Sequence, residues 1–132
     1  MKSYVITTAV VRYKDKYLIG KRAISKKFAS NKWEFISGFV DTSESVEEII
    51  LRELYEETKL KGKIVKSADP YINQDEEAKW IIIPYLVEVN TSNFVVNKKD
   101  HSELKLLSTN ELNNYEELAG DIEQLKIRGL LI

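Results

Sequence analysis

The segment 45–60 constrains the fold of this 132-residue chain more than any other stretch. Ser45 and Glu48 have the spacing of a capping box, which predicts that a helix begins there. The helix should run to about Thr58 or Lys59. At about 100° per residue, the first two turns carry an apolar stripe that should pack on the protein body, formed by Val46, Ile49 and Ile50.

Carboxylates continue this stripe in the second half of the predicted helix. Glu53, Glu56 and Glu57 are spaced i, i+3 and i+4, so they share one face. Acidic residues on a helix usually form a solvated outer face, because Glu is seldom buried. Here the outward arc is already filled by Glu48, Arg52, Tyr55 and Lys59. Like charges one turn apart cost about 0.2–0.5 kcal/mol per pair even when exposed, and a bound divalent cation would offset that repulsion.

The available side chains restrict which cation could bind. The chain has no cysteine and a single histidine, so the ligands on offer are oxygen atoms. This composition favours Mg²⁺ or Mn²⁺ and disfavours structural zinc. Mg²⁺ usually keeps several waters and is completed by substrate phosphates. The cluster therefore predicts a metal site for phosphate-ester or anhydride chemistry, without naming a reaction.

The remaining sequence reads as an α+β protein with a mixed sheet. Strand composition and alternation predict strands at residues 4–13, 17–19, 33–36, 63–72, 79–89 and 103–107. Loops or turns are predicted at residues 21–32, 37–42, 75–77 and 90–100. Within the second of these, Gly38 could adopt backbone angles that other residues avoid. A second capping-box spacing at Ser108 and Glu111 predicts a short helix, and the amphipathic segment 121–131 closes the chain.

Length, charge and hydropathy exclude several classes of protein. The length suits a single domain over residues 1–132. The formal net charge of −1 gives no basic face for polymeric nucleic acid. The longest apolar stretch, residues 80–87, is too short to span a bilayer, and the N-terminus lacks the features of a signal peptide. We therefore expect a cytoplasmic protein that does not enter a membrane.

Residues 38–60 resemble the Nudix box, whose pattern is G-x5-E-x7-R-E-U-x-E-E-x-G-U with U a bulky aliphatic residue. Gly38 is followed by five residues and Glu44, and seven more residues lead to the run RELYEETKL at 52–60. Every charged position matches, and the one departure is Lys59, where the family has a second glycine. Upstream, the run WEFISG at 33–38 is similar to the family's W-x-F-P-G-G lead-in.

The resemblance implies a Nudix-type α/β/α sandwich, in which a mixed sheet carries a catalytic helix after a Gly-containing loop. It also implies a Mg²⁺-dependent hydrolase, with Mn²⁺ as an alternative ion, that cleaves a phosphoanhydride bond in a nucleoside diphosphate derivative by attack of water at phosphorus. The short chain and the lead-in look most like the MutT-type enzymes for nucleoside triphosphates, including oxidised nucleotides. ADP-ribose, nucleotide sugars and dinucleoside polyphosphates stay open, as does a non-catalytic nucleotide-binding module. Many relatives form dimers, so a homodimer is also considered.

The resemblance assigns metal-binding roles on the helix and just before it. Glu53, Glu56 and Glu57 would hold one or more divalent cations, with Glu57 the surest ligand. Glu53 is the first choice for orienting or deprotonating the attacking water. Ser37 would add its backbone carbonyl, provided that the local backbone does not require the family's glycine.

Supporting roles follow from the same pattern. Arg52 and Glu44 are expected to pair and to brace the loop on the helix, ahead of direct catalysis. Glu103 resembles a loop position that often supplies a further catalytic carboxylate, and a plain edge-strand residue is the alternative. His101 could transfer protons, but a surface loop position is the preferred interpretation.

Substrate contacts are expected on the strands around the box. Four aromatic side chains could stack on a nucleobase, although at least two of them should belong to the core: Trp33, Phe35, Trp80 and Tyr85. Arg22, beside Lys21 at the end of the second strand, could meet phosphate oxygens, and an ordinary surface role is the alternative. Gly38 completes the expected substrate-binding set.

Overall fold

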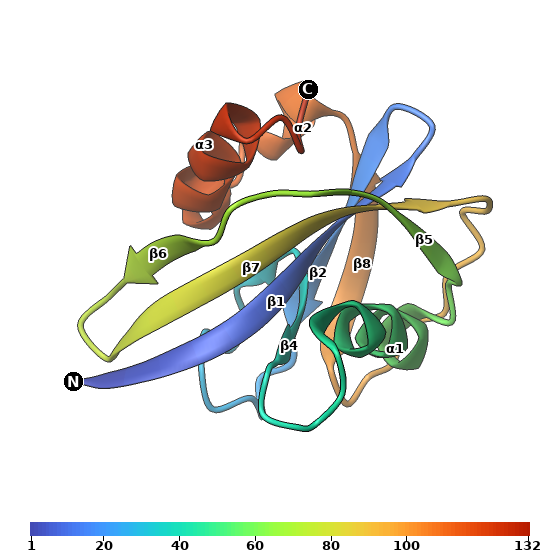
Figure 1. Cartoon of the computed structure of the whole chain (residues 1–132). Helices are drawn as coiled ribbons and strands as arrows, with labels where there is room; N and C mark the ends of the chain where they lie inside the picture. The colour runs from blue at the N-terminus through green and yellow to red at the C-terminus, as the bar shows by residue number, and fades with distance from the viewer.

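A mixed sheet of eight strands forms the centre of the protein in the computed structural model, which describes all residues from 1 to 132 (Figure 1). The strands are β1 (Lys2–Tyr13), β2 (Lys16–Arg22), β3 (Trp33–Glu34), β4 (Ile36–Phe39), β5 (Gly62–Ser67), β6 (Tyr71–Gln74), β7 (Ala78–Val89) and β8 (His101–Leu107). The main path runs β3-β2-β1-β7-β5, while β4 pairs with β1, β6 with β7 and β8 with β2. Only β1 and β7 are parallel neighbours.

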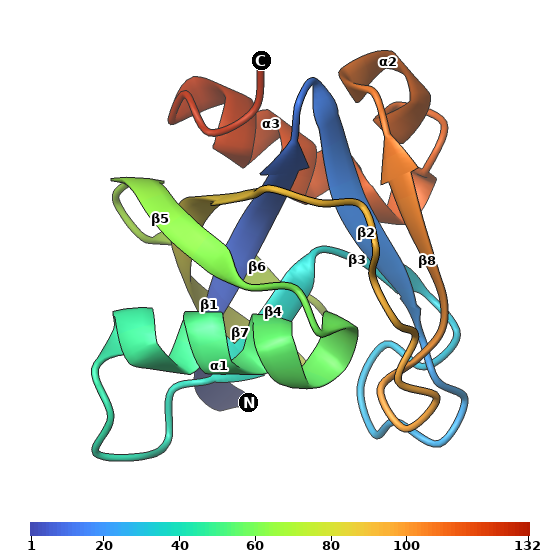
Figure 2. The ribbon, with the colours of Figure 1, turned by 90° about the vertical axis from the view of Figure 1, so that its right-hand side faces the viewer.

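Helices cover both faces of this sheet. The helical elements are α1 (Val46–Thr58), α2 (Thr109–Leu112), the 3₁₀ turn η1 (Glu116–Leu118) and α3 (Ala119–Ile127). Figures 1 and 2 show α1 on one side of the sheet and the C-terminal helices on the other. Each interface has its own apolar cluster, one containing Ile50 and Leu54 of α1 and the other Ile122 and Leu125 of α3. The α/β/α sandwich is confirmed.

The two central strands explain the apolar runs in the sequence. In β1, Ala9, Val10 and Val11 are fully buried although successive side chains point to opposite faces, because helices cover both faces of the sheet. Pro84 lies in β7 at the point where its outer neighbour changes from β6, paired as far as Ile82, to β5, paired from Tyr85. Proline has no N–H to donate to a neighbouring strand. β7 therefore tolerates Pro84 here, between the residues that pair with β6 and those that pair with β5.

Helix α1 begins and ends as the sequence predicts. The Ser45 side chain accepts a hydrogen bond from the Glu48 amide, and the Glu48 carboxylate accepts one from the Ser45 amide. Helical structure ends at Thr58, and Lys59 closes the helix with a left-handed φ of 64°. The family's glycine at this position would adopt that conformation without strain, so the lysine costs stability rather than changing the helix.

Three expectations about the sheet are wrong in detail. Residues 36–39 form β4 rather than the start of a turn, because they pair with β1, where Thr7 lies opposite Gly38. Gly38 has no left-handed φ. The predicted strand 63–72 is divided into β5 and β6, and β8 begins at His101 instead of residue 103. None of the helices has the length and the apolar character that a membrane-spanning helix requires.

Candidate functional site

The three carboxylates of the second half of α1 differ in burial. The side chain of Glu57 is 7% exposed, that of Glu53 24% and that of Glu56 53%. At about 100° per residue, Glu56 lies about 60° further round the helix than Glu53, which takes it to the rim of the buried face. The prediction of one shared inward face therefore holds for Glu53 and Glu57 and is wrong for Glu56.

Glu57 sits in a strongly acidic environment. Burial, a hydrogen bond with Glu53 and the nearby charges of Glu34, Glu53 and Asp100 raise its pKa to about 10. Burial and like charges both disfavour the ionised form. A divalent cation would reverse this balance, because it supplies the positive charge that the surrounding protein lacks.

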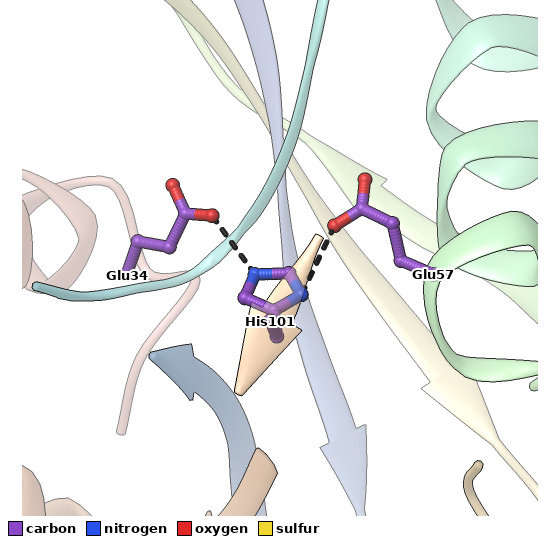
Figure 3. Close-up of side chains that lie close together, drawn as sticks. All are labelled: Glu34, Glu57 and His101. Atoms are coloured by element: carbon purple, nitrogen blue, oxygen red, sulfur yellow. Dashed lines mark hydrogen bonds and ion pairs between the residues drawn. The ribbon is translucent and has the colours of Figure 1, made fainter. Parts of the chain in front are cut away.

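His101 lies between two carboxylates, one from α1 and one from β3 (Figure 3). Its Nε2 is 2.9 Å from Glu34 Oε2, and its Nδ1 is 3.6 Å from Glu57 Oε1. Ligand atoms from these three residues lie within 4.8 Å of one another. The histidine is 1% exposed, so the expected surface position is wrong. Its ring packs over Gly20, where an added Cβ would lie 2.5 Å from Cδ2.

Arg52 ties the loop before α1 to the carboxylates. Its Nε and Nη2 donate to the two oxygens of Glu44 at 3.0 and 2.8 Å, which is a bidentate pair. These hydrogen bonds lower the pKa of Glu44. Nη1 of the same side chain reaches Glu53 and Glu56, each at 3.3 Å. Arg52 therefore lies beside the acidic face of α1 rather than on its outward arc.

Gly38 and Ser37 place β4 directly against α1. A Cβ on Gly38 would lie 2.5 Å from Glu53 Cγ, so the glycine is needed for space and not for its backbone angles. Ser37 likewise has no left-handed φ, so a serine fits in place of the family's glycine without strain. Its Oγ lies 2.9 Å from Thr8 Oγ1 and donates to the Phe35 carbonyl at 3.3 Å.

A pocket of about 370 Å³ opens beside these two residues. All four expected substrate-binding residues line it: Arg22, Trp33, Phe35 and Gly38. Phe35 is nevertheless buried in the core, as is Tyr85, which matches the expectation for two of the four aromatic side chains. Arg22 donates to Glu34 at 3.2 Å and to the Phe28 carbonyl at 2.8 Å, so internal contacts occupy its guanidinium.

The pocket is lined by aromatic and acidic side chains. Trp80 stacks on Tyr4, with ring centroids 4.9 Å apart, and meets Phe28 edge-on at 5.0 Å. The charged lining residues are mostly acidic: Glu34, Asp75, Glu77, Glu117 and Asp121 against Arg22 and Lys32. Burial raises the pKa of Asp121, which accepts a hydrogen bond from the Tyr71 hydroxyl at 2.7 Å. These walls suit an aromatic ring with polar edges better than phosphate groups.

Glu103 is not brought to the carboxylate cluster. It is exposed on β8 and its contact is Lys105, 3.7 Å away, whose ammonium also lies over the ring of Trp33. Trp33 packs against the core cluster of the C-terminal helices. The register of β2 and β8 shifts between Lys21 and Arg22. The shift inserts a residue in β8, so Glu103 and His101 point to opposite faces of the sheet.

Sequence reasoning missed three residues of the site. Glu34 occupies the variable position of the lead-in, Asp121 lies in a C-terminal helix, and Phe28 belongs to an irregular loop. Only Glu34 carries a sequence signal, because a charged residue alternates there with the large apolar residues Trp33 and Phe35.

Comparison with known proteins gives a family and a fold. The family model described as NUDIX domain matches residues 3–127. No curated protein sequence matches the chain. The structure is similar to a MutT protein from Methanosarcina mazei Go1, with 23% identity over 87% of this chain and 83% of that one and a TM-score of 0.77.

Two further solved structures have the same fold. A NUDIX hydrolase from Nitrosomonas europaea has 17% identity over 98% of this chain and 92% of that chain, with a TM-score of 0.77. The NUDIX domain of Shewanella oneidensis NrtR, solved in a complex with ADP ribose, has 19% identity over 97% and 89%, also with a TM-score of 0.77.

Proposed function

Because the chain belongs to the NUDIX family of hydrolases, we propose that it is a Mg²⁺-dependent pyrophosphohydrolase of a nucleoside triphosphate or an oxidised nucleotide. The family cleaves pyrophosphate bonds in nucleotide derivatives and uses divalent metal ions. One observation carries the proposal for this chain. Glu57 and Glu53 point into the protein, and Glu53 packs on Gly38, a wall of the pocket.

The donor set fits a hard divalent cation. Glu53, Glu56 and Glu57, with the backbone carbonyl of Ser37, would hold the ion, and oxygen ligands are those that Mg²⁺ and Mn²⁺ prefer. The raised pKa of Glu57 supports this role, because a carboxylate in that position lacks a cationic partner in the protein. When bound, the cation neutralises charge on the diphosphate and promotes loss of a proton from water.

We assign proton transfer to Glu53. Its carboxylate is partly exposed, adjoins the pocket wall at Gly38 and is held by Arg52, whose other nitrogens are fixed by Glu44. A positioned carboxylate base typically contributes about 10²–10⁴-fold to the rate. Glu103 is left out of this step, because it faces Lys105 and not the cluster.

The pocket supports a single nucleoside as the recognised group. Its volume of about 370 Å³ lies near the lower end of the roughly 300–1,000 Å³ range of ligand pockets, which disfavours burial of a whole dinucleoside polyphosphate. The acidic side chains of the lining repel phosphates, so the diphosphate would extend over Ser37 and Gly38 toward Glu53. ADP-ribose is the second candidate, because the similar NUDIX domain of Shewanella oneidensis NrtR was solved with that ligand.

A hydrolysis screen tests the proposal. Nucleoside triphosphates, oxidised nucleotides, ADP-ribose, nucleotide sugars and dinucleoside polyphosphates would be incubated with Mg²⁺, with Mn²⁺ and with EDTA. Cleavage of a nucleoside triphosphate or oxidised nucleotide that EDTA abolishes is the expected result. Cleavage of ADP-ribose alone would move the assignment to the second candidate. Absence of turnover by folded protein that binds Mg²⁺ would favour a nucleotide-binding module.

A further inference from the structure

We propose that His101 is a ligand of the divalent cation, binding through Nδ1 beside Glu57, and that the centre therefore binds Co²⁺ and Zn²⁺ more tightly than Mg²⁺. The inference rests on the proposed function, because it adds a nitrogen ligand to the same metal centre. Neither the box pattern nor the carboxylates of α1 call for this ligand, since His101 comes from β8.

An unpartnered nitrogen is the first observation. His101 is 1% exposed, and its Nδ1 is the only buried side-chain nitrogen or oxygen atom without a hydrogen-bond partner. Buried polar groups in folded proteins almost always have one. Nδ1 points at Glu57 Oε1, but the separation of 3.6 Å is too long for a hydrogen bond (Figure 3). The atom therefore faces a carboxylate at ion-pair distance but makes no hydrogen bond to it.

The opposite side of the ring determines which nitrogen can bind a metal. Nε2 lies 2.9 Å from Glu34 Oε2, and Glu34 is itself held by Arg22 at 3.2 Å. Glu34 accepts a hydrogen bond from the neutral tautomer that carries its hydrogen on Nε2, and in that tautomer Nδ1 presents a lone pair toward Glu57. Metal-binding histidines have this arrangement, in which the ring nitrogen away from the metal donates to a carboxylate.

The separation of the two facing atoms is close to that of two ligands of one cation. Ligand atoms about 2.1 Å from a metal lie about 3.0–3.4 Å apart in octahedral or tetrahedral geometry. The observed separation is 3.6 Å, and the Glu57 carboxylate would turn aside from the axis of the Nδ1 lone pair for both atoms to bind one ion. The ring itself is held in place on two sides. It packs so closely on Gly20 that a Cβ there would clash with it, and Glu34 bonds to its far edge.

A nitrogen ligand changes which ions the centre favours. Mg²⁺ takes oxygen ligands, whereas imidazole suits the later divalent metals, whose affinity rises from Mn²⁺ toward Co²⁺ and beyond. The competing explanation is a histidine with a purely structural role, linking α1 to β3 between two carboxylates. Loss of a histidine with that role would affect folding, but it would not lower the affinity for Co²⁺ more than the affinity for Mg²⁺.

His101→Gln separates the two explanations. The glutamine amide can still donate to Glu34 from near the position of Nε2, but it removes the Nδ1 lone pair. Binding of Co²⁺ alone and Mg²⁺ alone would be measured by calorimetry for wild type and for His101→Gln, with Ser102→Ala at the exposed neighbour as a matched control. We expect Co²⁺ affinity to fall at least about tenfold, because loss of a residue that only hydrogen-bonds to a metal ligand already costs that much. Mg²⁺ affinity should change by less than about threefold.

Equal changes for the two ions, or no change for either, would overturn the inference. A second measurement, on wild type, tests the inference even if His101→Gln does not fold. Electron spin echo spectroscopy of the Mn²⁺-loaded protein should show coupling to a histidine nitrogen. Wild type that hydrolyses nucleotides with Mg²⁺ but lacks this coupling would overturn the inference alone. Nitrogen coupling and selective loss of Co²⁺ in a protein without hydrolase activity would overturn only the proposed function. Wild type that binds no divalent cation would overturn both.

Discussion

Gly38→Ala should displace Glu53 without unfolding the protein. The added Cβ would lie 2.5 Å from Glu53 Cγ and 3.1 Å from Cδ, whereas carbon atoms in contact are about 3.5–4.0 Å apart. The shortfall is therefore about 1 Å or more. Because the atoms met belong to a flexible, partly exposed side chain, Glu53 rather than the backbone should move. We expect a cost in unfolding free energy of about 1 kcal/mol, the low end for overpacking.

The catalytic effect should be much larger than the effect on stability. A misplacement of about 1 Å in a catalytic group can cost about 10²-fold in rate, which corresponds to about 2.7 kcal/mol in activation free energy. The assay is kcat/KM on the best substrate with Mg²⁺, together with thermal unfolding of the same samples.

Gly120 provides the matched control. A Cβ there meets nothing within 4 Å, so Gly120→Ala in α3 should keep full activity and add about 0.5–1 kcal/mol of stability. Full activity in Gly38→Ala would show that catalysis does not depend on the position of Glu53. Unfolding of Gly38→Ala would contradict the expected small loss of stability, because the clash would have reached the backbone.

Three other perturbations have expected outcomes. Arg52→Lys loses the bidentate pair with Glu44, and we expect turnover to fall about 10–100-fold with little change in melting temperature; unchanged turnover would mean that Arg52 does not position Glu53. In EDTA, unfolding free energy should fall as pH rises from 5 to 9, because Glu57 keeps its proton in the folded state up to a pKa of about 10 but loses it near 4.5 when unfolded. Mg²⁺ and Glu57→Gln should each reduce this dependence of the unfolding free energy on pH. The same pH dependence in Glu57→Gln as in wild type would exclude Glu57 as its source. Lys59→Gly relieves the left-handed φ of 64° and should add about 0.5–1 kcal/mol to the unfolding free energy at unchanged turnover; a drop in melting temperature would show that the lysine is not strained.

Local sequence signals predicted α1 well. The capping box at Ser45 and the spacing of the box residues depend on contacts between residues within a few turns of each other. The same signals could not tell Glu56 from Glu57, because that distinction depends on how far the helix is rotated against β4. The resemblance to the box predicted the layers of the fold, which spacing alone does not.

The errors concern residues whose positions depend on distant partners. Gly38 lies in a strand because Thr7 pairs with it across 31 positions of sequence. His101 is buried because β8 pairs with β2 and brings the ring over Gly20. Glu103 occupies the edge-strand position that the sequence left open as the alternative, and it faces away because of a register shift that no alternation of apolar and polar residues reveals. Each of these features is set by sheet pairing, so a single sequence carries little sign of it.

The central claim is that Glu53 and Glu57 form the metal-dependent catalytic centre of a nucleotide pyrophosphohydrolase. The most direct test is the turnover of Glu53→Gln and Glu57→Gln with Mg²⁺, on protein shown to be folded. Each variant should lose at least about 10²-fold in kcat, the lower bound for a positioned carboxylate. Near-normal turnover in both folded variants would contradict this claim.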